Sequence, residues 1–419
     1  MRITWRRLRE PFAGPARIER PAGARRPALG LGLWAITVAA TAQPLHVYLT
    51  WQGDTSRTMT VNYQTAGHAP ASWVYYDTRP RGGEAEAYRY QVPGGHHQIP
   101  GLADGRWVHV VELTGLQPGK TYYFIAGDST GGFSPERQFR TIPSGDGPLR
   151  FVTGGDMGVG ELPQKLMAQA ALHGPQFAAI GGDIAYANGR LENIGLWDQW
   201  LEAWERWMVT PEGLTIPMAL AIGNHEVNGA YNRPKENAPF YFGFFAQAEE
   251  SYFSRRFGAN LVFLFLDTGH IAAHGGPQAD WLEAELARHR NARYTFAVYH
   301  VPLYPSHRDY EGAGSQAGRA HWAPLFDRYG LTTAFENHDH TFKRSKLLKE
   351  GKPDPDGTLY LGDGCFGRAP RTVDAELRWY LDRAESIAHF WLVDVTRRSV
   401  RYRAFDAEGR RIDVYPPEK

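Results

Sequence analysis

Between residues 149 and 340, five apolar segments each end in a polar residue of a kind that binds metal ions. The segments are typical of buried β-strands because they are short, apolar and bounded by turn residues. They alternate with segments of helical periodicity at 161–172, 195–209, 278–289 and 320–329. Strands that alternate with helices indicate layered α/β packing around a sheet, and this order constrains the fold more than any other feature of the chain.

Seven potential metal ligands follow these apolar segments. They are Asp156 in GGDMG, Asp183 and Tyr186 in GGDIAYANG, Asn224 in GNHE, His300 in VYHVPLY, and His338 and His340 in ENHDHTFKR. Because the carboxyl ends of strands share one edge of an open α/β sheet, we expect the seven side chains to meet in one crevice. His338 and His340 are two positions apart, so in an extended chain they face one spot while Asp339 faces away. A sixth segment, LVFLFLDT, ends in Asp267, for which we expect a helix- or turn-capping role.

The chemistry of these side chains predicts two metal ions. The single cysteine, Cys365, excludes a cysteine-rich metal site, and oxygen and imidazole ligands suit iron, manganese or zinc. Seven donors are too many for one ion with an open position, but they are enough for two ions that share a carboxylate. Two ions about 3.5–4 Å apart form a clamp for in-line displacement at phosphorus. Glycines before Asp156, Asp183 and Asn224 are expected to allow sharp turns and to leave room for the ions.

Residues 43–143 have an all-β pattern. The segment MTVNYQT places Met59, Val61 and Tyr63 on one face, and further strand-like segments follow at spacings typical of a β-sandwich. The stretch LTGLQPGKTYYFIAG resembles a fibronectin type III-like domain. The residues that carry this likeness are Leu116, Pro118, Gly119 and Tyr122. A linker, SGDGP, then leads to a catalytic domain expected over 149–419.

Residues 1–42 have the features of a bacterial export signal. An arginine-rich stretch precedes the apolar segment 28–42, which is too short to span a bilayer comfortably. The segment ends in Ala40-Thr41-Ala42, which has the small-x-small form of a cleavage site. We expect the signal to be removed, leaving a periplasmic or secreted protein without a membrane span.

The charges of the chain nearly cancel. It has 46 Lys and Arg against 45 Asp and Glu, a net charge of +1. No overall field therefore favours nucleic acid or an anionic membrane surface as a partner. A small phosphate ester is the expected partner, and the sequence does not predict the oligomeric state.

The motifs DMG, GDIAY, GNHE, the histidine of VYHVPLY, and HDH resemble, in this order, the five-block signature of the purple acid phosphatases. These enzymes are a branch of the metallophosphoesterases, and they also carry a fibronectin-like N-terminal domain. The resemblance implies two metal sites. The first would contain Asp156, Asp183, Tyr186 and His340, and the second Asp183 as a bridge, Asn224, His300 and His338. It also implies Fe(III) at the tyrosinate site and Fe(II), Zn or Mn at the second.

One substitution within the signature points to this branch. Most two-metal phosphoesterases begin with an Asp-x-His block, whereas Gly158 stands at the place of that histidine. Tyr186 would replace the missing ligand with a phenolate, which favours Fe(III) and would colour the protein. The resemblance also implies that His225 contacts the substrate phosphate and protonates the leaving oxygen. His307 resembles another phosphate-contacting histidine, although an exposed loop position is an equal alternative.

The chain departs from the family pattern at Asn337, where glycine is usual, and at Ala297, where valine is usual. Neither is a proposed ligand, so we expect these changes to affect loop shape and the substrate pocket. Glu226 fits the pattern, and a hydrogen-bonding role is expected.

The resemblance predicts an acid phosphatase that hydrolyses phosphate monoesters with hydroxide bound to the metal ions. Two alternatives remain open. One is a phosphodiesterase that acts on nucleotide or lipid diesters with the same metals. The other is a degenerate binding protein, which the complete set of seven donors argues against.

Overall fold

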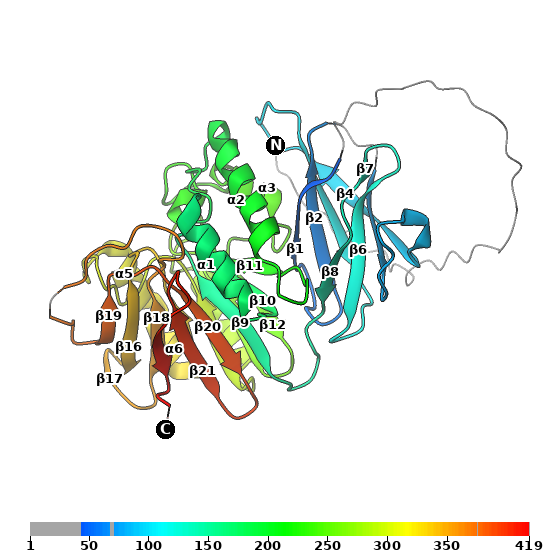
Figure 1. Cartoon of the computed structure of the whole chain (residues 1–419). Helices are drawn as coiled ribbons and strands as arrows, with labels where there is room; N and C mark the ends of the chain where they lie inside the picture. The colour runs from blue at the N-terminus through cyan, green and yellow to red at the C-terminus, as the bar shows by residue number, and fades with distance from the viewer. Residues whose placement is uncertain (1–42, 68–70, 375, 419) are drawn as a thin grey trace, which may run out of the picture.

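The computed structural model describes residues 43–67, 71–374 and 376–418, and Figure 1 shows an all-β domain beside a larger domain of sheets and helices. This arrangement confirms the predicted fold class. The predicted export signal at residues 1–42 lies outside the described residues. Among the residues that the structure describes, no helix has the length and apolar character needed to cross a bilayer.

The N-terminal domain consists of antiparallel strands. They are β1 (Leu45–Thr50), β2 (Met59–Thr65), β3 (Ser72–Asp77), β4 (Tyr90–His97), β5 (Trp107–Leu113), β6 (Thr121–Asp128), β7 (Gly132–Phe133) and β8 (Arg137–Arg140). The first half of β4 pairs with β3 and its last residues pair with β5, so β4 joins the two parts of the domain. Met59, Val61 and Tyr63 of β2 are buried in the domain core, as their alternation predicts.

The larger domain contains two sheets. One has the order β11 (Met218–Leu220), β10 (Phe177–Ile180), β9 (Leu149–Gly154), β20 (Phe390–Val395), β21 (Val400–Phe405) and β22 (Arg411–Tyr415). The other has the order β12 (Phe253–Phe257), β13 (Leu261–Phe265), β14 (Tyr294–Val298), β15 (Thr333–Phe335), β18 (Thr358–Gly362), β16 (Phe342–Lys349) and β17 (Lys352–Pro353), and β19 (Leu381–Glu385) pairs with β16. Phe151 and Phe177 of the first sheet contact Phe263 of the second.

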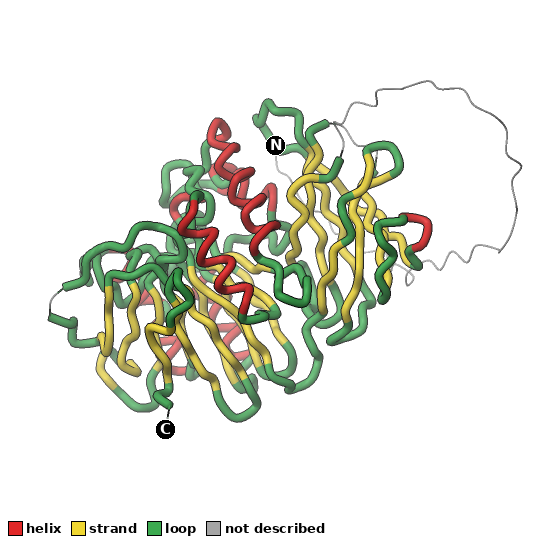
Figure 2. Tube along the Cα trace, in the orientation of Figure 1, coloured by secondary structure: helices red, strands yellow, loops and turns green. Residues whose placement is uncertain are grey.

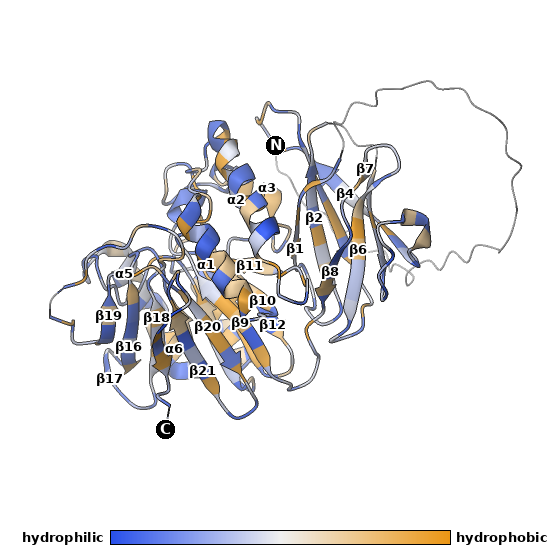
Figure 3. Cartoon of the chain, in the orientation of Figure 1, coloured by the Kyte–Doolittle hydropathy of each residue, from blue (hydrophilic) through white to orange (hydrophobic). Residues whose placement is uncertain are grey.

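The expectation of a single sheet is therefore wrong. Each apolar strand is buried on both faces, between a helix layer and the opposite sheet. A strand in one sheet with helices on both faces has the same apolar pattern, so periodicity alone does not separate the two arrangements. Figure 3 shows hydrophobic residues along the strands of this domain and hydrophilic residues on the outer faces of α1 and α2.

Helices cover the outer face of each sheet (Figure 2). They are α1 (Glu161–Leu172), α2 (Ile194–Trp207), α3 (Pro239–Phe244), α4 (Pro277–Arg288), α5 (Ala313–His321) and α6 (Ala323–Tyr329), with short 3₁₀ turns at Ala85–Ala87, Leu191–Asn193, Asn224–Glu226 and Lys235–Asn237. Trp197, Trp200, Leu201 and Trp204, which recur at helical spacing in α2, are buried as expected for a helix face packed on the core, whereas Trp207 is only partly buried. The helix predicted over 320–329 is instead broken at Trp322, between α5 and α6.

The two domains share a packed interface on which β1 meets α2 and α3. The Tyr48 hydroxyl donates to the Phe244 carbonyl at 2.6 Å, and the Thr50 hydroxyl donates to the Ala246 carbonyl at 2.7 Å. Asn62, on the face of β2 that alternation would expose, is fully buried. Strand β2 is therefore covered on both faces.

The carboxyl ends of the parallel strands position the candidate site. Strands β9, β10 and β11 are parallel to one another, and β13, β14, β15 and β18 are parallel in the other sheet. Asp183 follows β10 and His300 follows β14, and these two side chains are 3.1 Å apart. The ends of both sheets thus contribute to one place.

Candidate metal centre

A first group of donor atoms comes from Asp156, Tyr186 and His340. The Tyr186 hydroxyl donates to Asp156 Oδ1 at 3.1 Å and lies 3.1 Å from His340 Nε2. His340 Nε2 in turn lies 2.9 Å from Asp156 Oδ1. Three side chains from three separate loops therefore face one point.

A second group comes from Asp183, Asn224, His300 and His338. His300 Nε2 lies 3.1 Å from Asp183 Oδ2, 3.0 Å from Asn224 Oδ1 and 2.9 Å from His338 Nδ1. The two groups are adjacent, because the His338 backbone N–H donates to Asp156 Oδ2 at 2.7 Å. The structure thus brings together all seven predicted donors.

The geometry of both groups suits metal ions. Ligand atoms bound at right angles to one ion, at about 2.0–2.2 Å, are about 3 Å apart. The contacts within each group are 2.9–3.1 Å. Asp183 Oδ2 is buried and accepts no hydrogen bond from any described residue, which leaves a lone pair for a cation. Asp183, His300 and His338 have ligand atoms within 4.8 Å of one another.

The electrostatics of the second group also favour positive charge. Burial would lower the pKa of His300, but the Asp183 and Asp156 carboxylates raise it to about 9. Burial would raise the pKa of Asp183, but His300 holds it well below its usual value. Without metal, the His300 ring is therefore protonated at the position where a metal ion would bind. Metal binding has to displace that proton.

Tyr186 would need a strongly charged cation in order to ionise. Burial, followed by the Asp156 and Asp183 carboxylates, raises the pKa of its phenol far above the usual value. The guanidinium of Arg368 lies 4.4 Å from the Tyr186 ring centroid and opposes this shift. Ionisation of this phenol would therefore require a multivalent cation bound beside it.

Backbone strain is concentrated at the candidate donors. Ten non-glycine residues in the described ranges have positive φ, and half of them are candidate donors. These are Asp156 (57°), Asp183 (52°), Tyr186 (61°), His338 (79°) and His340 (55°). Each such residue costs about 1–3 kcal/mol and persists where the surrounding structure fixes it, which is common at functional sites.

The expectation that His338 and His340 face one spot from an extended chain is wrong. Strand β15 ends at Phe335, and both histidines have positive φ, so the chain is not extended there. His338 belongs to the second group and His340 to the first, so the two rings contact different groups of donors. Asp339 does face away, and its carboxylate accepts from the Arg308 guanidinium at 3.0 Å.

The predicted sharp turn is seen at Gly182, which has a φ of 86°, whereas Gly155 and Gly223 leave room for side chains rather than directly for ions. A Cβ atom on Gly155 would lie 2.6 Å from Asn337 Oδ1, and one on Gly223 would lie 2.4 Å from Asp183 Oδ1. Asn337 is buried, and its amide donates to the Tyr299 carbonyl at 2.8 Å. The departure from the family pattern at Asn337 therefore fills space between the strand ends.

Arg368 and Tyr186 occupy the space beside Gly158, the position at which most two-metal phosphoesterases have a histidine. A Cβ atom on Gly158 would lie 3.2 Å from Arg368 Cδ and 3.7 Å from Tyr186 Cδ2. A larger side chain at residue 158 would displace the arginine or the tyrosine. The glycine at residue 158 thus leaves the space that the Tyr186 ring and Arg368 need.

Glu226 supports the loop that carries Asp183. Its carboxylate accepts the backbone N–H groups of Asp183 at 2.7 Å, Ile184 at 2.8 Å and Gly223 at 2.9 Å. Burial and the Asp183 carboxylate raise the pKa of Glu226 to about 7, and the N–H donors of Ile184 and Gly223 oppose the rise. The expected hydrogen-bonding role of Glu226 agrees with these contacts.

His225 lies at the open side of the two groups. Its ring packs against Tyr186 with centroids 4.1 Å apart, and its Nε2 is 3.7 Å from Asp183 Oδ2. Its Nδ1 is hydrogen-bonded to the side-chain oxygen of Asn188. With Nδ1 donating to that oxygen, Nε2 is the nitrogen left to exchange a proton with a substrate.

His307 lies near the second group but does not join it. Its backbone N–H donates to Asp339 Oδ2 at 2.7 Å, and its Nδ1 is 2.8 Å from the Thr372 carbonyl. The ring makes no hydrogen bond with a candidate donor among the described residues. A phosphate contact by His307 therefore stays a prediction.

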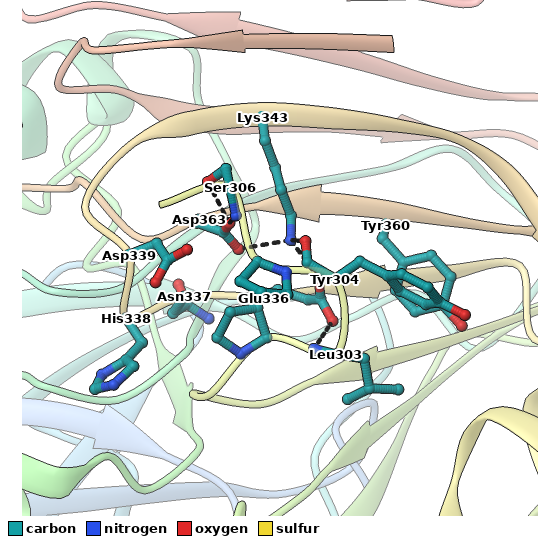
Figure 4. Close-up of polar contacts among 12 residues, drawn as sticks. Leu303, Tyr304, Ser306, Glu336, Asn337, His338, Asp339, Lys343, Tyr360 and Asp363 are labelled. Carbon is teal, nitrogen blue, oxygen red and sulfur yellow. Dashed lines mark hydrogen bonds and ion pairs between the residues drawn. The ribbon is translucent and has the colours of Figure 1, made fainter. Parts of the chain in front are cut away.

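A buried ionic network lies behind His338 and Asp339 (Figure 4). Lys343 is fully buried, and its ammonium lies 2.5 Å from Glu336 Oε2 and 2.8 Å from Asp363 Oδ1. It also donates to the Tyr304 carbonyl at 2.5 Å. Asp363 Oδ2 accepts from the Ser306 hydroxyl at 2.6 Å.

This network fixes the segment that carries two candidate ligands. Glu336 precedes and Lys343 follows the segment 337–342, which contains His338 and His340. Burial would lower the pKa of Lys343, but Asp363 and Glu336 raise it above its usual value, so the ammonium stays charged.

Sequence reasoning missed three residues at the centre: Asn188, Arg368 and Asp363. Asn188 follows Tyr186 by two positions, and only its place inside the GGDIAYANG block hinted at a role. Arg368 and Asp363 come from the segment after β18, which carries no ligand pattern. The predicted capping role of Asp267 is seen, since its carboxylate accepts the backbone N–H group of His270 at 2.7 Å.

Two family models match this chain. "Purple acid Phosphatase, N-terminal domain" matches residues 44–141, and "Calcineurin-like phosphoesterase" matches residues 150–342. The first match covers the strands of the N-terminal domain. The second contains all seven candidate donors.

Named relatives and a solved structure agree with these matches. Purple acid phosphatase 18 of Arabidopsis thaliana is 26% identical over 380 residues, which are 84% of this chain and 78% of that protein. Purple acid phosphatase 15 of Arabidopsis thaliana is 27% identical over 284 residues, 61% of this chain and 53% of that protein. The structure of purple acid phosphatase PPD1 from yellow lupin (Lupinus luteus) seeds superposes with a TM-score of 0.75 at 19% identity, over 89% of this chain and 74% of the lupin chain.

Proposed function

Because the chain belongs to the purple acid phosphatase family of phosphoric ester hydrolases, we propose that it is a dinuclear metal-dependent acid phosphatase that hydrolyses phosphate monoesters. The observation that carries this proposal is that two groups of potential ligands lie next to each other. One group contains a tyrosine hydroxyl, and the other contains two imidazole rings and an asparagine amide. Such a pair suits two ions of different kinds.

The donor sets assign the ions. Asp156, Tyr186 and His340 would hold Fe(III), and Asn224, His300 and His338 would hold Fe(II), Zn or Mn, with Asp183 shared between the two. When bound, the ions would make hydroxide available from water near neutral pH and offset the negative charge of the phosphate.

Two further side chains have roles in proton transfer and in positioning. His225 would bind the phosphate and give the proton on Nε2 to the leaving oxygen, while Asn188 holds the other ring nitrogen. Glu226 would keep the Asp183 loop in place through three backbone hydrogen bonds. A substrate at the open side would meet His225 before it reaches the buried donors.

Metal analysis and a pair of model substrates test this function. Protein purified without added metal should contain about two metal ions per chain, at least one of them iron, and should hydrolyse p-nitrophenyl phosphate faster than its bis ester. Faster hydrolysis of the bis ester would favour the phosphodiesterase alternative. Absence of hydrolysis with two ions bound would favour the degenerate binding protein.

The Tyr186→Phe variant should lose visible absorption while it keeps part of the activity. The hydroxyl that would form the coloured iron phenolate is removed, but Asp156 and His340 remain to bind the ion. Absorption spectra of the metal-loaded proteins measure this effect. Tyr231→Phe, which removes a nearby phenol outside the first group, should leave the spectrum unchanged; an unchanged spectrum in Tyr186→Phe would contradict ferric binding there.

The hydrolysis rate should fall as pH rises through the pKa of His225. Burial lowers this pKa below its usual value, and Asp183 only partly opposes the effect. Because a general acid acts in its protonated form, the loss of rate belongs on the alkaline side of an acidic optimum. A kcat/KM profile measured with wild type and His225→Asn should show this decline in the wild type and a flatter profile in the variant. A wild-type rate that keeps rising through neutral pH would contradict the role.

Export is also part of the proposal. It is supported by the apolar segment and the Ala40-Thr41-Ala42 cleavage pattern. Mass spectrometry of the protein recovered from its producing cell would test it, because cleavage after Ala42 places residue 43 at the N-terminus.

A further inference from the structure

A cavity of about 720 Å³ adjoins the candidate metal centre. His338 is the one candidate donor in its wall, and the remaining wall comes from the segments around Tyr231, Gly269, Val301 and Ala317. The volume lies within the range of pockets that hold small-molecule ligands. A phosphate bound at the donors would leave this space for the rest of its ester.

The wall of the cavity is built largely from small residues. Helix α5 contributes Ala313, Gly314 and Ala317, and the turn that follows Asp267 contributes glycines and an alanine. A Cβ atom on Gly314 would lie 3.1 Å from Val301 Cγ1, so even one added carbon would crowd this wall. Small side chains thus keep the space open.

Tyr231 lies at the border between this cavity and the metal centre. The residue is 39% exposed although it belongs to the cavity wall. Its ring centroid is 4.9 Å from that of His270, whose ring centroid is 5.7 Å from that of His300. Burial, followed by Asp183, raises the pKa of the Tyr231 phenol to about 12, so the ring is neutral.

A strained loop presents Tyr231. Its neighbours Ala230 and Asn232 both have positive φ, 66° and 54°. The loop is pinned, because the Asn232 N–H donates to the Gly269 carbonyl at 2.9 Å and His270 Nδ1 lies 2.9 Å from the Ala230 carbonyl. Non-glycine residues are held in this conformation where the surrounding structure fixes them, which is common at ligand-binding sites.

The charges of the cavity wall are balanced. Among the described residues that line it, Arg308 is the one permanent cation and Asp309 the one carboxylate. The Arg308 guanidinium already donates to the His338 carbonyl at 2.6 Å and to Asp339 Oδ1 at 3.0 Å. Burial lowers the pKa of His274 to about 4, so its ring is uncharged. The permanently charged side chains of the wall therefore offer no surplus positive charge for a second phosphate group.

We propose that this cavity holds the alcohol part of the phosphate monoester, and that the preferred alcohol is a large, uncharged aromatic group that stacks on Tyr231. The inference rests on the proposed function and names its substrate class. A flat ring suits a wall of glycine and alanine beside an exposed aromatic side chain, because offset stacking and apolar burial act together.

Filling the cavity tests the proposal. We compare kcat/KM for 1-naphthyl phosphate and glycerol 2-phosphate in the metal-loaded wild type and in Ala317→Leu. The variant should lose about tenfold or more on the naphthyl ester and stay within about twofold on the glycerol ester. Ala320→Leu, an exposed position on the same helix, should change neither value. Comparing each variant with the wild type cancels the different intrinsic reactivities of the two esters.

A second pair of variants tests the stacking. Tyr231→Leu removes the ring and keeps an apolar side chain, so the naphthyl ester should lose about threefold to tenfold, whereas Tyr231→Phe should retain the wild-type value. Binding of 1-naphthylphosphonate, measured against methylphosphonate without turnover, should follow the same order.

Two results would overturn the inference. An equal effect of Ala317→Leu on both esters, or no effect on the naphthyl ester, would contradict the cavity as the site of the alcohol while leaving the phosphatase function intact. A wild-type protein that hydrolyses neither ester would contradict the proposed function and this inference together.

Discussion

The Asp183→Asn variant should lose at least one metal ion per chain, and its kcat/KM should fall at least about 100-fold. Substitution of a residue behind a metal ligand already costs 10- to 100-fold in metal affinity or activity, and Asp183 is the proposed shared ligand itself. Its Oδ2 is buried without a hydrogen bond, and a metal ion there would replace the proton on the His300 ring 3.1 Å away. An asparagine oxygen can still accept the His225 N–H that Asp183 Oδ1 accepts at 2.7 Å, which preserves the local fold. Elemental analysis and hydrolysis of p-nitrophenyl phosphate measure the two effects.

Asp267→Asn is the matched control for that variant. Asp267 also follows an apolar strand and is fully buried, but its carboxylate caps a turn through the N–H groups of His270 and Ile271. This control should lose stability and keep its metal content. If Asp183→Asn kept two ions and most of its activity, Asp183 would not be a shared ligand.

The Lys343→Met variant should lower the free energy of unfolding by about 3–5 kcal/mol. The ammonium is fully buried between two carboxylates, and its removal leaves Glu336 and Asp363 buried without their cation. Urea unfolding of the metal-free protein measures this loss without a contribution from bound ions. Because the network holds the segment with His338 and His340, metal affinity should fall as well, by about 10- to 100-fold.

Two further variants separate the network from a general effect on β16. Lys346→Met changes an exposed lysine on the same strand and should alter the free energy of unfolding by no more than about 0.5 kcal/mol. Adding Glu336→Gln and Asp363→Asn to Lys343→Met should recover part of the lost stability, because no unpaired charge then remains. A loss in Lys346→Met as large as in Lys343→Met would show that the ionic network is not the cause.

The site could be predicted from the sequence because its residues follow recognisable strands. Asp156, Asp183, Asn224 and His300 each come shortly after an apolar run, and the ends of parallel strands meet at one edge. The place of Tyr186, three positions after Asp183, led to its prediction as an unusual ligand. These features depend on the order of residues within short segments, which can be read from a single sequence.

Features that depend on contacts between distant segments could not be predicted. The choice between one sheet and two depends on which strands face each other, and an apolar strand looks the same in both. The conformation at His338 and His340 depends on hydrogen bonds to Asp156 and to the segment around Arg371. The partners of Lys343 lie 7 and 20 positions away in the chain, so its burial had no local signal.

The covering of β2 on both faces also determines how the chain can be divided. Arg106 of the first domain forms hydrogen bonds of 2.5 and 3.0 Å with the Asp198 carboxylate on α2, next to the carbonyl contacts made by Tyr48 and Thr50. Cutting the protein in the linker would leave these groups, and the tryptophan-rich helix behind them, facing water. We therefore expect a fragment cut in the linker to expose apolar surface that the N-terminal domain covers in the whole chain, and to aggregate more readily.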